Sequence, residues 1–323
     1  MDEIIDMEEF SVLSSYGEDL TKKEYVTNPA IARDSEIKKL IMVLLTPEKS
    51  GLLVGKPGIG KTAIVEGLAY LINKDLVPDA LKGYRIIKLN STSLLGKINL
   101  NGKEELIIQL LVKELKNTTK TIIFIDEVHT LMGASSDNPM DLANILKPGL
   151  DRGDIKAIGA TTTEEYERYV IRDRAFVRRF ERIDVEEPSI ETTVKILYGS
   201  LPKYEHQTGC KFKYNEYVTT MLIEAIVNAT SEFKRVYGLS AMYPDVAFSV
   251  LQNAFSEALF QNRHEVNVLD VYNAIKNSKR IYPDSIVKEL SAFREKFSQL
   301  SMEENIVLPV VTIDDIDNSV ENY

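Results

Sequence analysis

Short apolar runs alternate with segments of helical spacing from about residue 26 to residue 187. Each apolar run has about the length of a buried strand. The runs fall at 51–55, 84–90, 121–126, 155–162 and 182–187, and the helical segments start near Asp34 and span 61–73 and 103–116. Strands that are apolar on both sides and separated by helices are typical of a parallel sheet covered on both faces. Residues 26–187 are therefore predicted to form an α/β domain.

The pattern changes after residue 187. Helical spacing fills 190–204, 215–230, 243–259 and 268–279, and no strand pattern separates these segments. A small all-helical domain is therefore predicted over 188–281. Beyond it, residues 282–323 hold one further helical segment and end in an acidic tail.

The N-terminal 25 residues are acidic and weakly periodic, so residues 1–25 are interpreted as a leader or linker. The first 20 carry seven acidic residues and no lysine or arginine, against a net charge of -10 for the whole chain. This is the opposite of a signal or transit peptide. No apolar run approaches the roughly 18 residues that cross a bilayer. The sequence predicts a cytoplasmic protein without membrane contact.

Metal cages and direct nucleic-acid binding are not expected. The chain has a single cysteine, Cys210, and three scattered histidines, His129, His206 and His264, with no pair at metal-ligand spacing. Its acidic balance lacks the basic footprint of a nucleic-acid-binding domain. The candidate chemistry must therefore come from other residues.

A glycine-rich turn connects the apolar run at 51–55 to the helical segment at 61–73. It reads GKPGIGKT and fits the pattern G-x-x-x-x-G-K-[ST]. Its members are Gly55, Lys56, Pro57, Gly58, Ile59, Gly60, Lys61 and Thr62. Glycines allow backbone N–H groups to point at phosphate oxygens, and the following helix adds the positive end of its dipole.

Within this turn, Lys61 is expected to reach the β- and γ-phosphates of a nucleotide, and the Thr62 hydroxyl to ligate Mg²⁺. The alternative is a glycine-rich turn with an incidental lysine. It would account for the residue types, but not for their position between a predicted strand and a predicted helix. We therefore interpret the turn as a phosphate-binding loop.

A second acidic site follows the apolar run of TIIFIDEVHTL, at Asp126 and Glu127. Asp126 is expected to hold Mg²⁺ through its water shell. Glu127 is then placed to accept a proton from water that attacks the γ-phosphate. Two solvated acids at a strand end are the alternative, which the upstream phosphate loop makes less attractive.

Four segments together resemble the first ATPase module of the Clp chaperone ATPases, members of the AAA+ superfamily. They read GKPGIGKTAIVEGLA, IIFIDEVHTLMGA, LANILKPGLDRGDIKAIGATTTEEYERY and RAFVRRFERIDVEEPSIETTVKIL. The similarity runs from about Tyr16 to about Asn277. It implies a five-stranded parallel sheet, a small helical lid over the adenine, ATP with Mg²⁺ as cofactors, and a ring usually of six subunits.

The resemblance also implies roles for single residues. Thr162 matches the sensor that orients the lytic water, and Arg178 and Arg179 match arginines offered to the neighbouring subunit's γ-phosphate. An arginine supplied in this way neutralises charge in the transition state. Ile31 matches an apolar position near the adenine, where ordinary packing explains it equally well.

The chain departs from the family pattern at two places. Leu100, in GKINLNGKEEL, stands where the family carries an aromatic residue that grips substrate in the pore, so threading is in doubt. In SAMYPDVA, Ala241 and Val246 stand where the family has Arg and Lys. Lys234 and Arg235 are nearby but out of register, so a cationic contact from the lid is not expected.

The family's N-terminal adaptor-binding domain, second ATPase ring and peptidase-docking loop have no counterpart in these 323 residues. Docking onto a proteolytic chamber is therefore not expected. The sequence predicts a ring-forming ATPase that hydrolyses ATP and remodels an unidentified protein partner. Alternatives are an ATP-dependent assembly switch that threads no substrate, an ATPase loader in a DNA transaction, and a binding module without hydrolysis.

Overall fold

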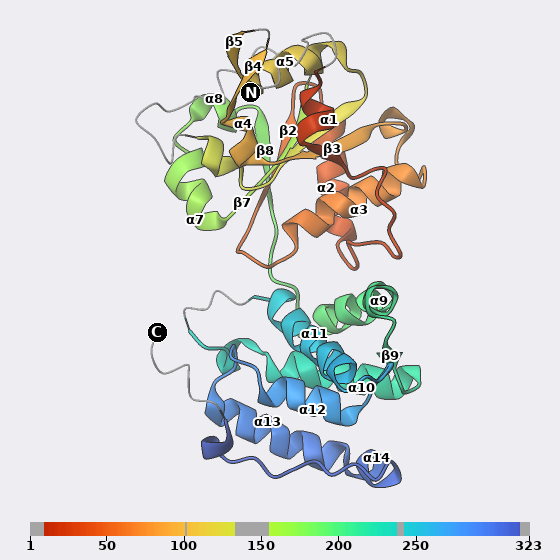
Figure 1. Cartoon of the computed structure of the whole chain (residues 1–323). Coiled ribbons are helices and arrows are strands. Elements are labelled where there is room, and N and C mark those ends of the chain that lie inside the picture. The colour runs from red at the N-terminus through yellow and green to blue at the C-terminus, as the bar shows by residue number, and fades with distance from the viewer. Residues whose placement is uncertain (1–9, 101, 133–154, 238–241, 317–323) are drawn as a thin grey trace. The chain divides into compact units, whose positions relative to one another are not determined.

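The computed structural model describes residues 10–100, 102–132, 155–237 and 242–316 (Figure 1). The chain forms two compact units. The first comprises Met1–Lys56 and Lys61–Glu186, and the second comprises Pro57–Gly60 and Glu187–Tyr323. The sequence pattern predicted a change of domain after residue 187.

A six-stranded sheet forms the centre of the first unit. In spatial order its strands are β1 (Gly17–Asp19), β3 (Arg85–Leu89), β6 (Thr121–Ile125), β7 (Lys156–Thr161), β2 (Ser50–Val54) and β8 (Phe180–Asp184). The five strands from β3 to β8 are parallel, and β1 pairs with β3 in the antiparallel sense. The predicted α/β class is confirmed, with β8 earlier in the chain than the predicted 182–187.

Helices cover both faces of this sheet, which explains why β2 and β6 are buried at all five positions. Leu52 and Val54 share a buried cluster with α5 (Ile107–Asn117). Side chains alternate between the faces of a strand, so Gly51 points to the other face, where Leu40 of α2 (Asp34–Leu45) packs against it. Helix α3 (Lys61–Asn73) packs beside α2.

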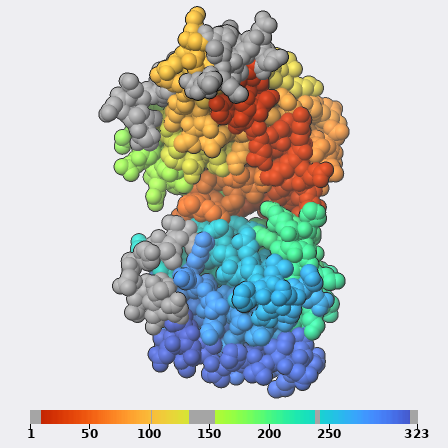
Figure 2. Space-filling model, viewed as in Figure 1, coloured from red at the N-terminus to blue at the C-terminus, as the bar shows by residue number. Residues whose placement is uncertain are grey.

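The predicted leader is part of this unit from Phe10 onward. Helix α1 (Val12–Tyr16) begins at the N-cap Ser11 and leads directly into β1. Oε2 of Glu114, in α5, accepts from the backbone N–H of Val12 at 2.7 Å and of Leu13 at 3.2 Å. This segment, red in Figure 2, forms part of the surface of the first unit. Its helix and strand are too short to show periodicity, so the sequence pattern missed them.

The predicted helix over 103–116 is also corrected. Residues Lys103–Leu106 form β5, which pairs with β4 (Lys97–Leu100) in an antiparallel hairpin, and the helix starts only at Ile107. The chain turns next to Gly102, which has a φ of 79°. An Asn-Gly pair between short strands is a hairpin signal.

Short elements complete the first unit. They are η1 (Asp79–Leu81), α4 (Ser91–Leu94), η2 (Val128–Leu131), α7 (Thr163–Glu165), the π-helical turn η3 (Tyr166–Val170) and α8 (Arg174–Val177). Several of them follow the carboxyl ends of the parallel strands, where ligands bind in open α/β sheets.

The second unit is built mainly from helices. They are α9 (Ile190–Thr208), α10 (Glu216–Ala229), η4 (Glu232–Lys234), α11 (Asp245–Phe260), α12 (Val268–Lys276), α13 (Pro283–Lys296), α14 (Ser298–Glu303) and η5 (Ile313–Asp315). A short parallel pair, β9 (Lys211–Phe212) and β10 (Glu265–Val266), joins them. The prediction of an all-helical domain missed this pair because two residues are too few to show alternation.

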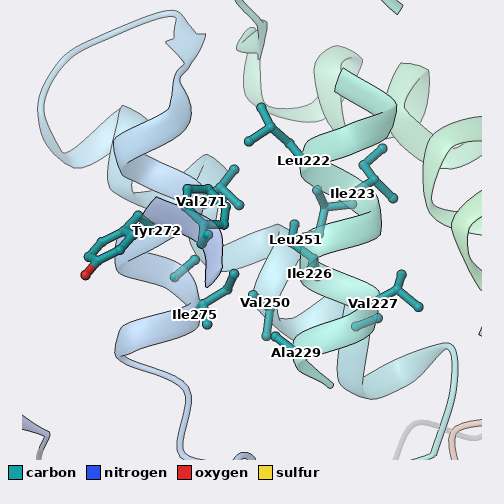
Figure 3. Close-up of a cluster of buried hydrophobic side chains, with 14 of the residues drawn as sticks. Leu222, Ile223, Ile226, Val227, Ala229, Val250, Leu251, Val271, Tyr272 and Ile275 are labelled. Carbon is teal, nitrogen blue, oxygen red and sulfur yellow. The ribbon is translucent and has the colours of Figure 1, made fainter. Parts of the chain in front are cut away.

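Figure 3 shows the core of the second unit, where α10, α11 and α12 meet through side chains such as Ile226, Leu251 and Tyr272. Helix α13 adds Leu290 and Phe293 to the same core. Val311, beyond α14, is also buried in it. The described part of the predicted 282–323 tail therefore belongs to the packed unit.

Among the helices in the described ranges, none has both the length and the apolar composition needed to cross a membrane.

Candidate nucleotide site

The glycine-rich turn lies between β2 and α3, as the sequence predicted. Gly58 and Gly60 have φ angles of 77° and 96°, in the region that side chains with a Cβ rarely adopt. These two glycines let the chain turn sharply after the buried strand. The turn then delivers Lys61 and Thr62 to the first turn of α3.

Lys61 folds back over the loop. Its Nζ donates to the backbone oxygens of Gly55 at 2.7 Å and of Lys56 at 3.1 Å. Burial lowers the pKa of Lys61, and the negative charges of Asp126, Glu165 and Glu127 partly oppose that shift. A cation that is partly desolvated and bonded to neutral carbonyls is well suited to accept an anionic ligand.

Thr62 and Asp126 meet across the sheet, although 64 positions separate them in the chain. The Thr62 hydroxyl donates to Asp126 Oδ2 at 2.9 Å. The other carboxylate oxygen of Asp126 accepts from the backbone N–H of Glu127 at 3.1 Å. The glycine-rich turn and the acid pair therefore lie together at the carboxyl ends of β2 and β6.

Glu127 has a left-handed backbone conformation, with φ 51° and ψ 46°. The backbone N–H and hydroxyl of Thr130 both donate to its carbonyl oxygen, at 3.0 and 2.9 Å. The Glu127 side chain is exposed. It borders a hollow of about 450 Å³, together with Asp126, Glu18 and Lys88.

Thr162 follows β7 and caps α7. Its hydroxyl donates to Glu165 Oε2 at 2.7 Å and accepts from the Glu165 backbone N–H at 3.2 Å. The Thr162 backbone N–H donates to the same carboxylate oxygen at 3.1 Å, which completes a capping box. The predicted sensor residue thus has a fixed hydroxyl, one strand away from both Gly55 and Asp126 in the sheet order.

The two predicted arginines lie at the opposite end of β2. The backbone N–H of Ser50 donates to the Arg179 carbonyl at 2.9 Å, and Lys49 Nζ donates to the Arg178 carbonyl at 2.9 Å. Both arginines line a hollow of about 540 Å³ with Lys49 and Arg174. The structure therefore does not bring Arg178 or Arg179 to the phosphate site of the same chain.

Ile31 is half-buried in the turn that precedes α2. Its neighbour Ala30 is buried and packs against Gly67 of α3. This turn therefore lies beside the helix that starts in the glycine-rich turn, and the place of Ile31 near the adenine stays a prediction.

Comparisons with known proteins fit this arrangement. Residues 51–186 match the family described as "ATPase family associated with various cellular activities (AAA)". Chaperone protein ClpB of Corynebacterium efficiens is 35% identical over 302 residues, which cover 91% of this chain. The chain carries an AAA+ ATPase domain of the Clp chaperone family. ATP is the nucleotide implied for its site.

Other relatives of this Clp-family domain agree. A probable ATP-dependent Clp protease ATP-binding subunit of Chlamydia pneumoniae is 38% identical over 251 residues, 76% of this chain and 28% of that protein. The chain spans about a third of the length of its relatives, 34% for the Corynebacterium protein. The S. cerevisiae Hsp104:casein complex in its extended conformation matches with 32% identity and a TM-score of 0.67, over 91% of this chain and 49% of that one.

Arg235 and Lys234, two basic residues in the second unit of this Clp-family protein, are paired with acids. Arg235 Nη1 lies 2.7 Å from Glu187 Oε1, and its Nε donates to the Thr230 carbonyl at 2.7 Å. Lys234 Nζ lies 2.8 Å from Glu289 Oε1. Val246 is fully buried, and Ala241 lies outside the described residues.

Two residues of the site escaped the sequence analysis. Glu165 is signalled by the spacing of Thr162 and Glu165, which is that of a capping box. His129 was considered only as a metal ligand. It is buried beside Glu165, and no motif would have indicated this.

Proposed function

We propose that this chain is a ring-forming ATPase, which hydrolyses ATP to ADP and phosphate and uses the cycle to remodel a protein partner. The observation that carries the proposal is the 2.9 Å bond between the Thr62 hydroxyl and Asp126, with Glu127 beside it. It unites a phosphate loop with the two acids that hydrolysis needs. Relatives named as chaperones, and an Hsp104 structure with casein, support a protein substrate.

The same pair of residues fits Mg²⁺. A hydroxyl and a carboxylate are hard oxygen donors, the kind that Mg²⁺ prefers, and the ion keeps several ligands from water and phosphate. No cluster of three or more His, Cys, Asp or Glu occurs within the described ranges. Thr62 and Asp126 would hold the ion, which would neutralise charge on the β- and γ-phosphates.

The protein's own residues divide the remaining work. Lys61 exchanges its two carbonyl partners for phosphate oxygens, which stabilises the charge of the triphosphate. Glu127 takes a proton from water as its oxygen attacks the γ-phosphorus, and the bond to the β–γ bridging oxygen breaks. Thr162 orients the water through its hydroxyl. The products are ADP and inorganic phosphate.

Two hollows of unlike charge support a ring. Glu18, Asp126 and Glu127 border the hollow at the carboxyl end of the sheet. Four basic residues and one acidic residue, Glu48, line the hollow at its opposite end, with Arg174 and Arg178 among the basic ones. Unlike surfaces that join head to tail generate a closed ring where the rotation between subunits closes. In such a ring, Arg178 and Arg179 reach the γ-phosphate of a neighbouring copy, and six copies are the expected number.

The test compares wild-type protein with Glu127→Gln. We expect the variant to bind ATP and to assemble, with a turnover at least ~100-fold lower, because a general base of this kind contributes about that much. Light scattering with and without ATP reports assembly, and phosphate release at increasing protein concentration reports hydrolysis in trans. Glu232→Gln, in the second unit, serves as the matched control. Unchanged turnover in Glu127→Gln would refute the assignment.

A second candidate function is an assembly switch that threads no substrate, and the placement of Leu100 favours it. The side chain is 1% exposed, within the β4–β5 hairpin. Leu100 therefore does not present the gripping side chain that its sequence position suggested, whereas Lys97, Asn99, Lys103 and Glu104 of the two strands are exposed. ATP-driven unfolding of a fluorescent protein substrate separates the two functions, since only a threading ring performs it.

The remaining partners and the location are proposed from the sequence. The acidic composition supports a cytoplasmic location and no direct nucleic-acid contact. One relative, from Oryza sativa, is named as chloroplastic. Imaging of a tagged full-length chain would test the location.

A further inference from the structure

His129 is held on both sides of its ring. It lies in η2 and is 8% exposed. Its Nε2 lies 3.1 Å from Glu165 Oε1, and its Nδ1 lies 3.2 Å from the Thr161 hydroxyl oxygen. A carboxylate can only accept, so Nε2 carries a proton. The Thr161 hydroxyl also lies 3.5 Å from Glu165 Oε2 and can donate either to that oxygen or to Nδ1. The ring of Tyr169 stacks on the imidazole, with centroids 6.2 Å apart.

The Glu165 carboxylate continues this chain of contacts to the predicted sensor. One of its oxygens faces His129, and the other accepts from the hydroxyl and the backbone N–H of Thr162. Glu165 is also close enough to Lys61 for its charge to favour the ammonium form. The direction of the Thr162 hydroxyl thus depends on where His129 holds Glu165.

At its other end, the chain of contacts reaches the predicted general base. The η2 turn that contains His129 also contains Thr130, which donates twice to the Glu127 carbonyl. Glu127 and Thr162 follow different strands, β6 and β7. The imidazole is a polar link between the turn that holds Glu127 and the helix that Thr162 caps.

We propose that His129 and Glu165 are positioning residues, which fix the Thr162 hydroxyl relative to Glu127 and so govern turnover rather than nucleotide affinity. This inference rests on the proposed ATPase function. The hydrogen bonds described for His129 and Glu165 join them to each other, to Thr161 and to Thr162, so we expect their loss to change turnover more than phosphate binding. Misplacement of reacting groups by a fraction of an ångström is enough to lower a rate strongly.

Two substitutions of His129 separate its contacts. Gln can place an amide nitrogen near the position of Nε2 and so donate to Glu165, whereas the shorter Asn reaches only the position of Nδ1. We expect His129→Asn to lower kcat about tenfold and His129→Gln to keep kcat within about threefold of wild type. The dissociation constant of a fluorescent ATP analogue should stay within about twofold for both. Equal values of kcat for the two variants would overturn the proposal.

Glu165 provides the test if the His129 variants do not fold. Glu165→Gln keeps the capping box, and Glu165→Ala removes both it and the contact with His129. We expect kcat to fall about tenfold in Glu165→Ala and to fall in Glu165→Gln as well, because the amide NH2 that then faces His129 cannot accept from Nε2–H. We expect no change in Glu164→Ala, the exposed neighbour. Full recovery in Glu165→Gln would show that the capping box alone sets kcat and would overturn the proposal. If Glu165→Ala turns over like Glu164→Ala, the inference is refuted while the ATPase function stands. If wild-type protein releases no phosphate, both are refuted.

Discussion

The cations of the phosphate site and those of the second unit are held in opposite ways. Lys61 is partly buried and donates to two neutral carbonyl oxygens. Arg235 and Lys234 are paired with the carboxylates of Glu187 and Glu289. When Lys61 binds a phosphate, the carbonyl oxygens that it leaves are neutral, so no buried charge loses its partner. A ligand that bound Arg235 would leave the Glu187 carboxylate without its cation.

This difference separates a cation that serves a ligand from one that serves the fold. Burial lowers the pKa of Lys61, which means that the free site destabilises its own charge. An anionic ligand relieves that cost. Arg235 also lies over the Tyr243 ring, 4.2 Å from its centroid, so its surroundings already satisfy it.

Substitution of Lys61 tests this difference most directly. Lys61→Met should weaken ATP binding at least ~100-fold, because the site loses a charge-assisted contact worth about 3 kcal/mol. It should leave the melting temperature unchanged or slightly raised, since a desolvated charge is removed. Titration with a fluorescent nucleotide and a circular-dichroism melt measure the two. Lys74→Met, exposed just beyond the other end of α3, is the control.

Arg235→Met should lower the stability of the protein and leave its nucleotide affinity unchanged. The Arg235 side chain is 7% exposed and that of Glu187 is 23% exposed, so the substitution leaves a largely buried carboxylate without its cation. We expect a loss of about 2 kcal/mol in the free energy of unfolding, below the 3–5 kcal/mol typical of a fully buried pair. Nucleotide affinity should not change. A variant of normal stability that binds ATP weakly would place Arg235 with Lys61 instead.

Alkaline pH should act on Lys61 before it acts on exposed lysines. Its pKa lies below the ordinary 10.5, so the ammonium loses its proton as the pH rises through that lowered value. ATP affinity should then fall, by up to about tenfold, starting below pH 10.5. The same titration raises stability, because over this range the folded state binds fewer protons than the unfolded state. In Lys61→Arg the guanidinium stays charged, so a fall of equal size there would point to another group.

Lys234→Met should have the smallest effect. Its side chain is 28% exposed and that of Glu289 is 19% exposed, so solvent screens the pair more than that of Arg235. We expect about 1 kcal/mol in urea denaturation and no change in nucleotide affinity. A loss larger than that of Arg235→Met would contradict the order of burial.

The sequence predicted best where one pattern covered many residues. The strands β2 and β6 and the helix α3 were located because long apolar runs and a phosphate-loop motif coincide there. The segment Val12–Asp19 was missed, since its helix and strand hold only a few residues each and depend on Glu114, about 100 positions away. Charge averaged over a segment cannot reveal a contact of that kind.

The site was predicted where its residues belong to a sequence motif and was missed where they depend on contacts between distant segments. Thr62 and Asp126 belong to motifs of known spacing, and the structure brings them together. His129 lies within the segment IIFIDEVHTLMGA, but that segment does not indicate its partners Thr161 and Glu165, which meet it only after β6 and β7 have paired. Leu100 was assigned to a gripping loop from its place in the chain, whereas hairpin pairing buries it.

Strand β2 carries the phosphate loop at one end and, through Ser50, the Arg179 carbonyl at the other. Its five residues span about 16 Å and are bonded to β7 and β8 along both edges. A buried strand that is hydrogen-bonded on both edges is rigid, because close-packed protein interiors have low compressibility. In the proposed ring, β2 would link the nucleotide site of its own subunit to the arginines that reach the site of one neighbour. A change at one site would therefore pass to the next subunit in one direction around the ring.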